Sequence, residues 1–253
     1  MTRCSFTLSL GLALGVLTLV FGCEAERRAD MVPITSRGVV RRNNIAVDIA
    51  NVAGSVTLVV RPGCLPEVKV QPVNGPSGKG GVRTKHGSAT GVEVDGKATL
   101  RVVGGAEPSN VWVSVPSCDW VRVRNSDGPV TLQGVCGEVD VQNDSTNVLS
   151  PVRIYAGPGV LGSVTVRSGR GDVELRAPRG SAASLVSKTP IAATDLRPGE
   201  SSVQRVRIEN GMLEATLNGG GPTWTLEAAR GRCVIDMGQH PQPAVELAEL
   251  WPF

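Results

Sequence analysis

The sequence predicts an all-β fold, a single-domain β-solenoid similar to a parallel β-helix, and three observations support this. Valine-rich segments recur at spacings of 18 to 25 residues. Apolar and polar residues alternate within each segment, as in strands with one buried face. Aromatic residues make up 3% of the chain, whereas glycine occurs 31 times and proline 17 times. This composition is typical of thin aliphatic layers joined by tight turns.

The repeat emerges when six segments are aligned on their first apolar residue. The segments start at Val121, Val139, Val164, Leu185, Val206 and Trp224, and an earlier copy starts at Val47. With the start as position zero, positions zero, two, nine and eleven are apolar in 21 of 24 cases in the six segments. Each copy therefore predicts two short strands, in rungs of about 20 residues whose stacking buries the apolar side chains. Polar Ser187 and Thr194 predict one distorted rung, and an antiparallel sandwich is the alternative fold.

The turn between the two strands contains a shared glycine. Position seven is Gly54, Gly128, Gly171 and Gly231 in four of the seven copies. Glycine is favoured where φ is positive or where the chain passes close to a neighbour. Gly171 is also the centre of Arg-Gly-Asp at 170–172, the tripeptide that integrin ligands display. Because this glycine belongs to the repeat, we interpret the tripeptide as a turn of the fold.

Residues 1–22 are predicted to be a lipoprotein signal peptide. Residues 8–21 form an apolar stretch that is too short to span a bilayer comfortably. It leads into "VFGC" at 20–23, which resembles the bacterial lipobox. The resemblance implies cleavage after Gly22 and lipidation of Cys23, and an ordinary secretory signal is the alternative. Residues 23–44 then form a flexible tether, in which Glu24 favours the outer membrane.

The rest of the chain divides into a repeat region and a cap. We expect the β-solenoid domain to occupy residues 45–237. Within it, residues 73–91 contain six glycines and predict a flexible loop. Residues 238–253 are expected to cover the last rung, because "AVELAELW" has helical spacing and open sheet edges invite aggregation.

The repeated phrases resemble those of a known family. Runs such as "VRVRNSDGPVTLQGVCGEVDV", "SVTVRSGRGDVEL", "RVRIENGMLEATLNGGG" and "WTLEAARGRCVI" resemble the bacterial DUF4097 family of adhesin-like proteins and its autotransporter-adhesin-like head-domain relatives. The resemblance covers about residues 45–237 and lies in the pattern of strands and turns rather than in one motif. It implies a β-solenoid on a cell-envelope protein with no established catalytic site.

The four cysteines that follow Cys23 predict one disulfide and no metal site. Cys118 and Cys136 each lie three residues before a repeat start, so they are expected to stack about 5 Å apart and to form a disulfide. Cys233 takes an inward position and is expected to be a buried apolar filler, and Cys64 has no evident partner. There is no CxxC pair, and the two histidines lie in polar segments, so no metal and no cofactor are expected.

One outward column of the rungs predicts a weak site for anionic glycan or lipid headgroups. At position three the copies carry Arg124, Gln142, Arg167, Lys188, Glu209 and Glu227, basic in the earlier copies and acidic in the later ones. With Arg122 and Arg207 beside it, the candidate anionic-ligand face is Arg122, Arg124, Arg167, Lys188 and Arg207. An ordinary solvated sheet face is the alternative interpretation.

These observations lead to a non-enzymatic, lipid-anchored protein of the bacterial cell envelope. Without residues 1–22 the chain has 25 basic and 23 acidic side chains, which does not suggest nucleic-acid binding. We expect it to contact the membrane through its lipid and to bind an envelope protein or a glycan, as an adhesin-like or interaction module. A β-helix lyase or hydrolase acting on polysaccharides is one alternative, although no two neighbouring rungs offer a convincing acid pair. A purely structural envelope protein is the other.

Overall fold

The computed structural model describes residues 45–73, 88–94, 97–104, 107–147 and 149–238, and this part of the chain is built almost entirely of strands. Its one helical element is the short 3₁₀ turn η1, Ile191–Ala193. Among the described residues, no helix is long and apolar enough to cross a membrane. The all-β prediction is confirmed.

Sixteen strands make up one open sheet. They are β1 (Ile45–Asn51), β2 (Val56–Val60), β3 (Glu67–Pro72), β4 (Ser88–Val94), β5 (Lys97–Val103), β6 (Ser109–Val115), β7 (Trp120–Asn125), β8 (Val130–Asn143), β9 (Val152–Ser168), β10 (Val173–Arg176), β11 (Ala183–Ser187), β12 (Thr194–Arg197), β13 (Val203–Glu209), β14 (Met212–Leu217), β15 (Thr223–Ala228) and β16 (Cys233–Asp236).

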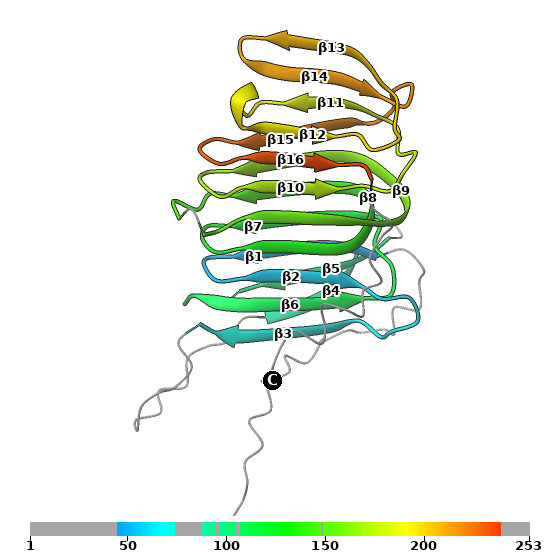
Figure 1. Ribbon diagram of the computed structural model, residues 1–253. Helices are drawn as coiled ribbons and strands as arrows, with labels where there is room; N and C mark the ends of the chain where they lie inside the picture. The colour runs from blue at the N-terminus through cyan, green and yellow to red at the C-terminus, as the bar shows by residue number, and fades with distance from the viewer. Residues whose placement is uncertain (1–44, 74–87, 95–96, 105–106, 148, 239–253) are drawn as a thin grey trace, which may run out of the picture.

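The sheet consists of two ladders that share the long strands β8 and β9 (Figure 1). The first ladder has the order β4-β5-β1-β7-β8-β9-β15-β11-β14-β13. The second has the order β3-β6-β2-β8-β9-β10-β16-β12. Pairing is parallel except at the outer ends, where β4, β3, β14 and β13 pair antiparallel to their neighbours.

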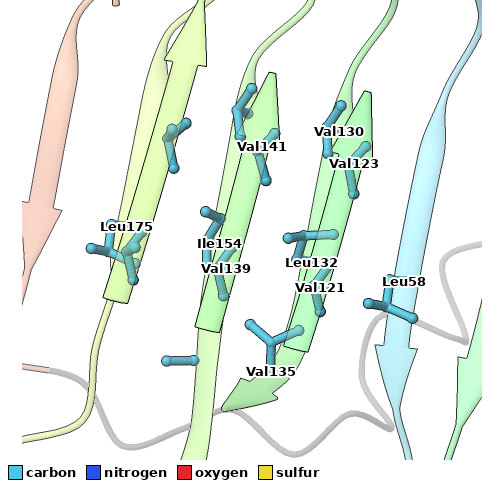
Figure 2. Close-up of a cluster of buried hydrophobic side chains, with 14 of the residues drawn as sticks. Leu58, Val121, Val123, Val130, Leu132, Val135, Val139, Val141, Ile154 and Leu175 are labelled. Atoms are coloured by element: carbon cyan, nitrogen blue, oxygen red, sulfur yellow. The ribbon is translucent and has the colours of Figure 1, made fainter. Parts of the chain in front are cut away.

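The predicted inward columns form the core. Val121, Val139 and Val164 are paired in register on neighbouring strands of the first ladder. Val130 and Leu132 stand beside Val152 and Ile154 in the second. All of these side chains are at most 2% exposed and belong to one hydrophobic cluster, part of which Figure 2 shows. Full burial of one such aliphatic side chain contributes about 1.5 to 3 kcal/mol, so the columns supply much of the stability.

The copies do not stack in their order along the chain. The strand that starts at Thr223 pairs with β9 on one side and with β11 on the other, so the Trp224 copy lies between the Val164 and Leu185 copies. The Val47 copy likewise lies between β7 and β5. Strands β5 and β6 form a further rung that the repeat alignment did not contain.

Two copies depart from the predicted pattern of strands. The Val206 copy is an antiparallel hairpin of β13 and β14, and Val206 and Ile208 are more than half exposed rather than buried. In the Val139 copy the second strand begins at Val152, four residues later than predicted, because an insertion lengthens the turn. The Leu185 copy keeps its place, with Ser187 fully buried and hydrogen-bonded to Thr194 at 3.1 Å.

Several predicted segments fall wholly or partly beyond the described residues. Strand β4 begins at Ser88, so the end of the predicted loop 73–91 is strand rather than loop. The middle of that loop, the signal peptide at 1–22, the tether at 23–44 and nearly all of the predicted cap at 238–253 lie outside the described residues.

Candidate interaction surface

A column of buried polar side chains holds the turns on which the surface is built. Position four carries Asn51, Asn125 and Asn143, all at most 5% exposed. Asn125 Nδ2 donates to the carbonyl oxygens of Asp127 (2.9 Å) and Gly128 (3.0 Å), and Asn51 Nδ2 donates to Asn125 Oδ1 at 3.2 Å. Ser168 continues the column by donating to the Gly171 carbonyl at 2.7 Å. Buried carbonyls without a partner are costly, so these amides stabilise each turn and join it to the next.

This buried polar column was not predicted, although its signal is present in the sequence. The repeat was defined by the apolar residues at positions zero, two, nine and eleven. A polar residue shared at position four does not contribute to such an alignment. Buried asparagine is uncommon and is almost always hydrogen-bonded, so a recurrent Asn between two apolar strands is itself an indicator of stacked turns.

The glycine column is required by close packing of the turns. A Cβ on Gly171 would lie 2.0 Å from the Ser150 carbonyl oxygen, and one on Gly231 would lie 2.5 Å from the Gly171 carbonyl oxygen. The interpretation of Gly171 as part of the fold is therefore confirmed. Its charged neighbours also have local contacts: Arg170 donates to the Thr146 carbonyl at 3.1 Å, and Asp172 accepts from the Arg232 amide at 2.7 Å.

The predicted basic column is interleaved with acids. Arg124 Nη2 lies 2.7 Å from Asp140 Oδ2, and Arg122 Nε lies 3.6 Å from the same oxygen. Arg167 is next to Glu227, because the Trp224 copy separates it from the Leu185 copy that carries Lys188. The expected change from basic to acidic along the column is therefore wrong, since it assumed stacking in chain order.

The five cationic residues of the predicted anionic-ligand face are not brought together into one patch. Arg122 and Arg124 share β7, while Arg167 is two strands away on β9. Lys188 follows β11, and Arg207 lies on the end strand β13, where it pairs with Glu209 at 2.8 Å. Binding of an anionic ligand by these residues stays a prediction.

A different set of surface residues shares one arrangement: an aromatic ring, a cation over it and a carboxylate beside the cation. Lys69 Nζ lies 5.0 Å from the centre of the Trp112 ring and 3.3 Å from Glu67. Arg122 lies 4.9 Å from Trp120 and pairs with Asp140. Arg176 lies 5.1 Å from Tyr155 and 2.5 Å from Glu174. Each contact is a cation–π interaction of about 0.5 to 1 kcal/mol at an exposed site.

Two of these clusters lie on the outer face of the second ladder. Along one column the register places Lys69, Trp112, Thr57, Thr131, Arg153 and Glu174 side by side. Tyr155 and Arg176 stand two residues further along the strands. With strands about 4.8 Å apart, Trp112 and Arg153 are separated by about 14 Å, and two short threonines lie between them. We call these eight residues the Trp112–Tyr155 face.

Cations outnumber carboxylates on this face, where Lys69, Arg153 and Arg176 stand against Glu174. Glu174 lies between Arg153 (3.7 Å) and Arg176 (2.5 Å), and the Arg61 guanidinium is a second cation over Trp112, at 5.7 Å. Partial burial, and then the charge of Glu174, raises the pKa of the Tyr155 hydroxyl, so this side chain stays a neutral hydrogen-bond donor at physiological pH. The face therefore offers aromatic surface and oriented donors, with an excess of positive charge.

The cysteines lie in different surroundings. Cys118 is 3% exposed and burial raises its pKa to about 12, with Sγ 3.2 Å from the Trp120 carbonyl oxygen. Cys136, one rung away, is half-buried with its Sγ toward Gly134 O, and burial raises its pKa as well. Both are thiols in this structure, and the Cys118–Cys136 disulfide stays a prediction. Cys233 is fully buried, as predicted, and Cys64 lies 3.5 Å from Ser114 Oγ.

Among the described residues, no group of three or more His, Cys, Asp or Glu side chains could hold a metal ion. His86 and His240 lie outside that part of the chain.

Comparison with known proteins gives one weak likeness. No protein-family profile matches the chain, and no curated protein is similar to it in sequence. Among solved structures it is similar to a "putative cell adhesion protein" from Clostridium sporogenes, with 10% sequence identity and a TM-score of 0.38, over 78% of this chain and 93% of that chain. The resemblance to the DUF4097 family therefore rests on the sequence pattern quoted above.

Proposed function

We propose that this protein is a lipid-anchored component of the bacterial cell envelope that binds a protein partner through the Trp112–Tyr155 face and catalyses no reaction. In this proposal Cys23 carries the lipid, residues 23–44 form the tether, and residues 45–237 form a β-solenoid that displays the face. The outer membrane is the favoured location.

The solenoid assignment is supported by the pairing of the copies. Except in the Val206 copy, the two strands of one copy enter two different ladders, and each pairs in parallel with the equivalent strand of another copy, at equivalent positions. The Asn51, Asn125 and Asn143 side chains also stack and are hydrogen-bonded to one another, so they align the same copies through polar contacts. Such an array is stiff, because each rung is fixed to its neighbours by backbone hydrogen bonds.

The observation that carries the binding proposal is the pair of aromatic–cation clusters on one face of the second ladder. Trp, Tyr and Arg are the residues most enriched at the energetic centres of protein interfaces. Trp112 and Tyr155 are both half-buried, and each has a cation held over its ring. Only the short side chains of Thr57 and Thr131 lie between Trp112 and Arg153 in the column, so we expect one partner to contact both aromatic side chains.

In-cell photo-crosslinking tests the proposal. Full-length protein carrying p-benzoylphenylalanine in place of Trp112 is expressed in its native host and irradiated. We expect a discrete crosslinked species whose second component is one envelope protein. The matched control carries the same group in place of Thr165, which points outward from the first ladder and should give no such species. Equal crosslinking at both positions, or none at position 112, would contradict partner binding and would favour a purely structural role.

Anchoring is tested separately. Cys23→Ala should move the protein from the membrane fraction to the soluble fraction and abolish incorporation of an alkyne-labelled fatty acid. Retention of label in this variant would refute lipidation at Cys23.

A further inference from the structure

The end of the first ladder exposes two side chains that point toward the core side of the sheet. Ile208 is paired with Leu213, which is 5% exposed, yet Ile208 itself is 60% exposed. Val206 lies two residues earlier on the same strand, hence on the same face, and is 57% exposed. Exposed Leu65 and Leu149, by contrast, lie outside the strands.

The exposure follows from the unequal lengths of the two ladders. Strands β11 and β12 belong to the same rung, but the first ladder continues through β14 to β13, whereas β12 is the last strand of the second ladder among the described residues (Figure 1). Ile191 and Leu196 pack against the core near this end, and Val203 is partly buried. Further along β13, the described part of the chain leaves Val206 and Ile208 uncovered.

Strand β13 is also irregular. Its register with β14 shifts between Gln204 and Arg207, and Arg205 has a φ of 49°, which is uncommon for a residue with a side chain. Among the described residues β13 has a neighbour on one side only. An irregular edge strand with two apolar side chains on its inner face resembles a surface that another segment covers.

The chain beyond Gly238 starts close to this surface. A Cβ on Gly199 would lie 3.0 Å from the Gly238 Cα, and Arg179 Nε donates to the Gly238 carbonyl at 3.3 Å. Gly199 lies in the turn that leads from β12 into β13. The 15 residues that follow Gly238 can extend up to about 50 Å, more than the roughly 23 Å length of the seven-residue β13.

The composition of residues 239–253 complements the surface. The segment contains Val245, Leu247, Leu250, Trp251 and Phe253, and its two acidic residues are Glu246 and Glu249. Strand β13 carries Arg205 directly before Val206, whereas Arg207 pairs with Glu209 of the same strand at 2.8 Å. A second copy of the protein is a poorer occupant, because a stable interface between proteins buries about 800 Å² on each partner and two side chains supply far less.

We propose that residues 239–253 fold back onto β13 of the same chain, with Leu247 and Leu250 covering Val206 and Ile208 and so closing the hydrophobic core. Val206 and Ile208 form the binding site on the described part of the chain, and the segment 239–253 is the proposed occupant. This proposal is independent of partner binding at the Trp112–Tyr155 face.

Photo-crosslinking within the purified, unlipidated chain tests it. With p-benzoylphenylalanine in place of Ile208, irradiation should join position 208 to a peptide from 239–253 within a monomer, identified by mass spectrometry after proteolysis. The same group in place of Val186, on the outer face of the first ladder, should give no such product. Crosslinks only between two copies would show a dimer instead and overturn the proposal, as would no crosslink to 239–253.

Hydrogen exchange gives a second test without a bulky probe. In the full chain, Leu247→Asp together with Leu250→Asp should speed amide exchange in β13 at least tenfold and leave exchange in β9 unchanged. Glu246→Gln with Glu249→Gln is the matched control at neighbouring positions and should change β13 much less. Unchanged β13 exchange in the Leu247→Asp, Leu250→Asp chain would overturn the proposal.

Discussion

Gly171→Ala tests how closely the turns are stacked. The new methyl group would meet the Ser150 carbonyl oxygen at 2.0 Å and the Ser150 carbonyl carbon at 2.5 Å, so the two turns must separate by about 1 Å or more. That movement strains the adjacent hydrogen bond from the Val152 amide to the Asp172 carbonyl, which is 2.8 Å long. Overpacking costs about 1 to 3 kcal/mol and a weakened buried hydrogen bond adds about 1 kcal/mol.

The expected loss for Gly171→Ala is therefore about 2 to 4 kcal/mol in the free energy of unfolding. Urea denaturation followed by circular dichroism measures it, in protein that lacks residues 1–22 and carries Cys23→Ala. Arg170→Ala is the matched control, because Arg170 is exposed and its bond to Thr146 is at the surface, so it should cost less than about 1 kcal/mol. If both variants unfold at the same urea concentration as the parent, the close approach of the turns is wrong.

Three further predictions concern the polar interior and the thiols. Asn125→Ala should lower the free energy of unfolding by about 2 to 4 kcal/mol, measured in the same assay, because it removes a buried amide that donates to the Gly54, Asp127 and Gly128 carbonyls and accepts from Asn51. A loss under 1 kcal/mol would contradict the role of the column. The hydrogen bond from Ser145, with others from Gly128 N and Ser150, lowers the pKa of Asp127, so its stabilising effect is present above the unfolded pKa and is lost as pH falls through the folded one. Asp127→Asn should therefore be less stable than the parent at pH 6 and approach it near pH 2, whereas a pH-independent gap would refute this. Peptide mapping without reduction should find Cys118 linked to Cys136 in exported protein, and two alkylated thiols would dispose of the bridge.

The sequence predicted the apolar interior well, because a buried strand imposes a period of two on its residues. Val121, Val123, Val130 and Leu132 are all fully buried as expected. Gly171 was likewise recognised, since close packing against the Ser150 carbonyl admits no side chain. Local geometry restricts the residue type at these positions, so the same residue types recur in the repeat.

The order of the copies could not be predicted, because every rung presents the same kind of aliphatic column to its neighbours. Nothing in the apolar pattern distinguishes β9–β11 pairing from the observed insertion of β15 between them. The prediction of a basic-to-acidic column depended on that order and was lost with it. The prediction that Val206 is buried was wrong for a related reason. The alternation of apolar residues around Val206 is that of a strand inside the ladder, whereas β13 is the last strand of the first ladder among the described residues.

The candidate surface was missed because its members come from separate parts of the chain. Lys69 and Trp112 meet through antiparallel pairing of β3 with β6, and β6 belongs to the rung that the alignment did not contain. Tyr155 and Arg176 are neighbours only because β9 and β10 pair in parallel. In the sequence, a few scattered aromatic residues give no reason to connect these positions.

The Trp112–Tyr155 face is the proposed binding site, and the affinity of the crosslinked partner for purified variants tests it most directly. Biolayer interferometry should show Trp112→Ala weakening the Kd by at least about tenfold, as for an interface hot spot, and Tyr155→Ala weakening it in the same direction. Thr165→Ala, on the first ladder, should change the Kd by less than about twofold. An unchanged Kd in Trp112→Ala and Tyr155→Ala, with each variant folded by circular dichroism, would contradict the proposed function.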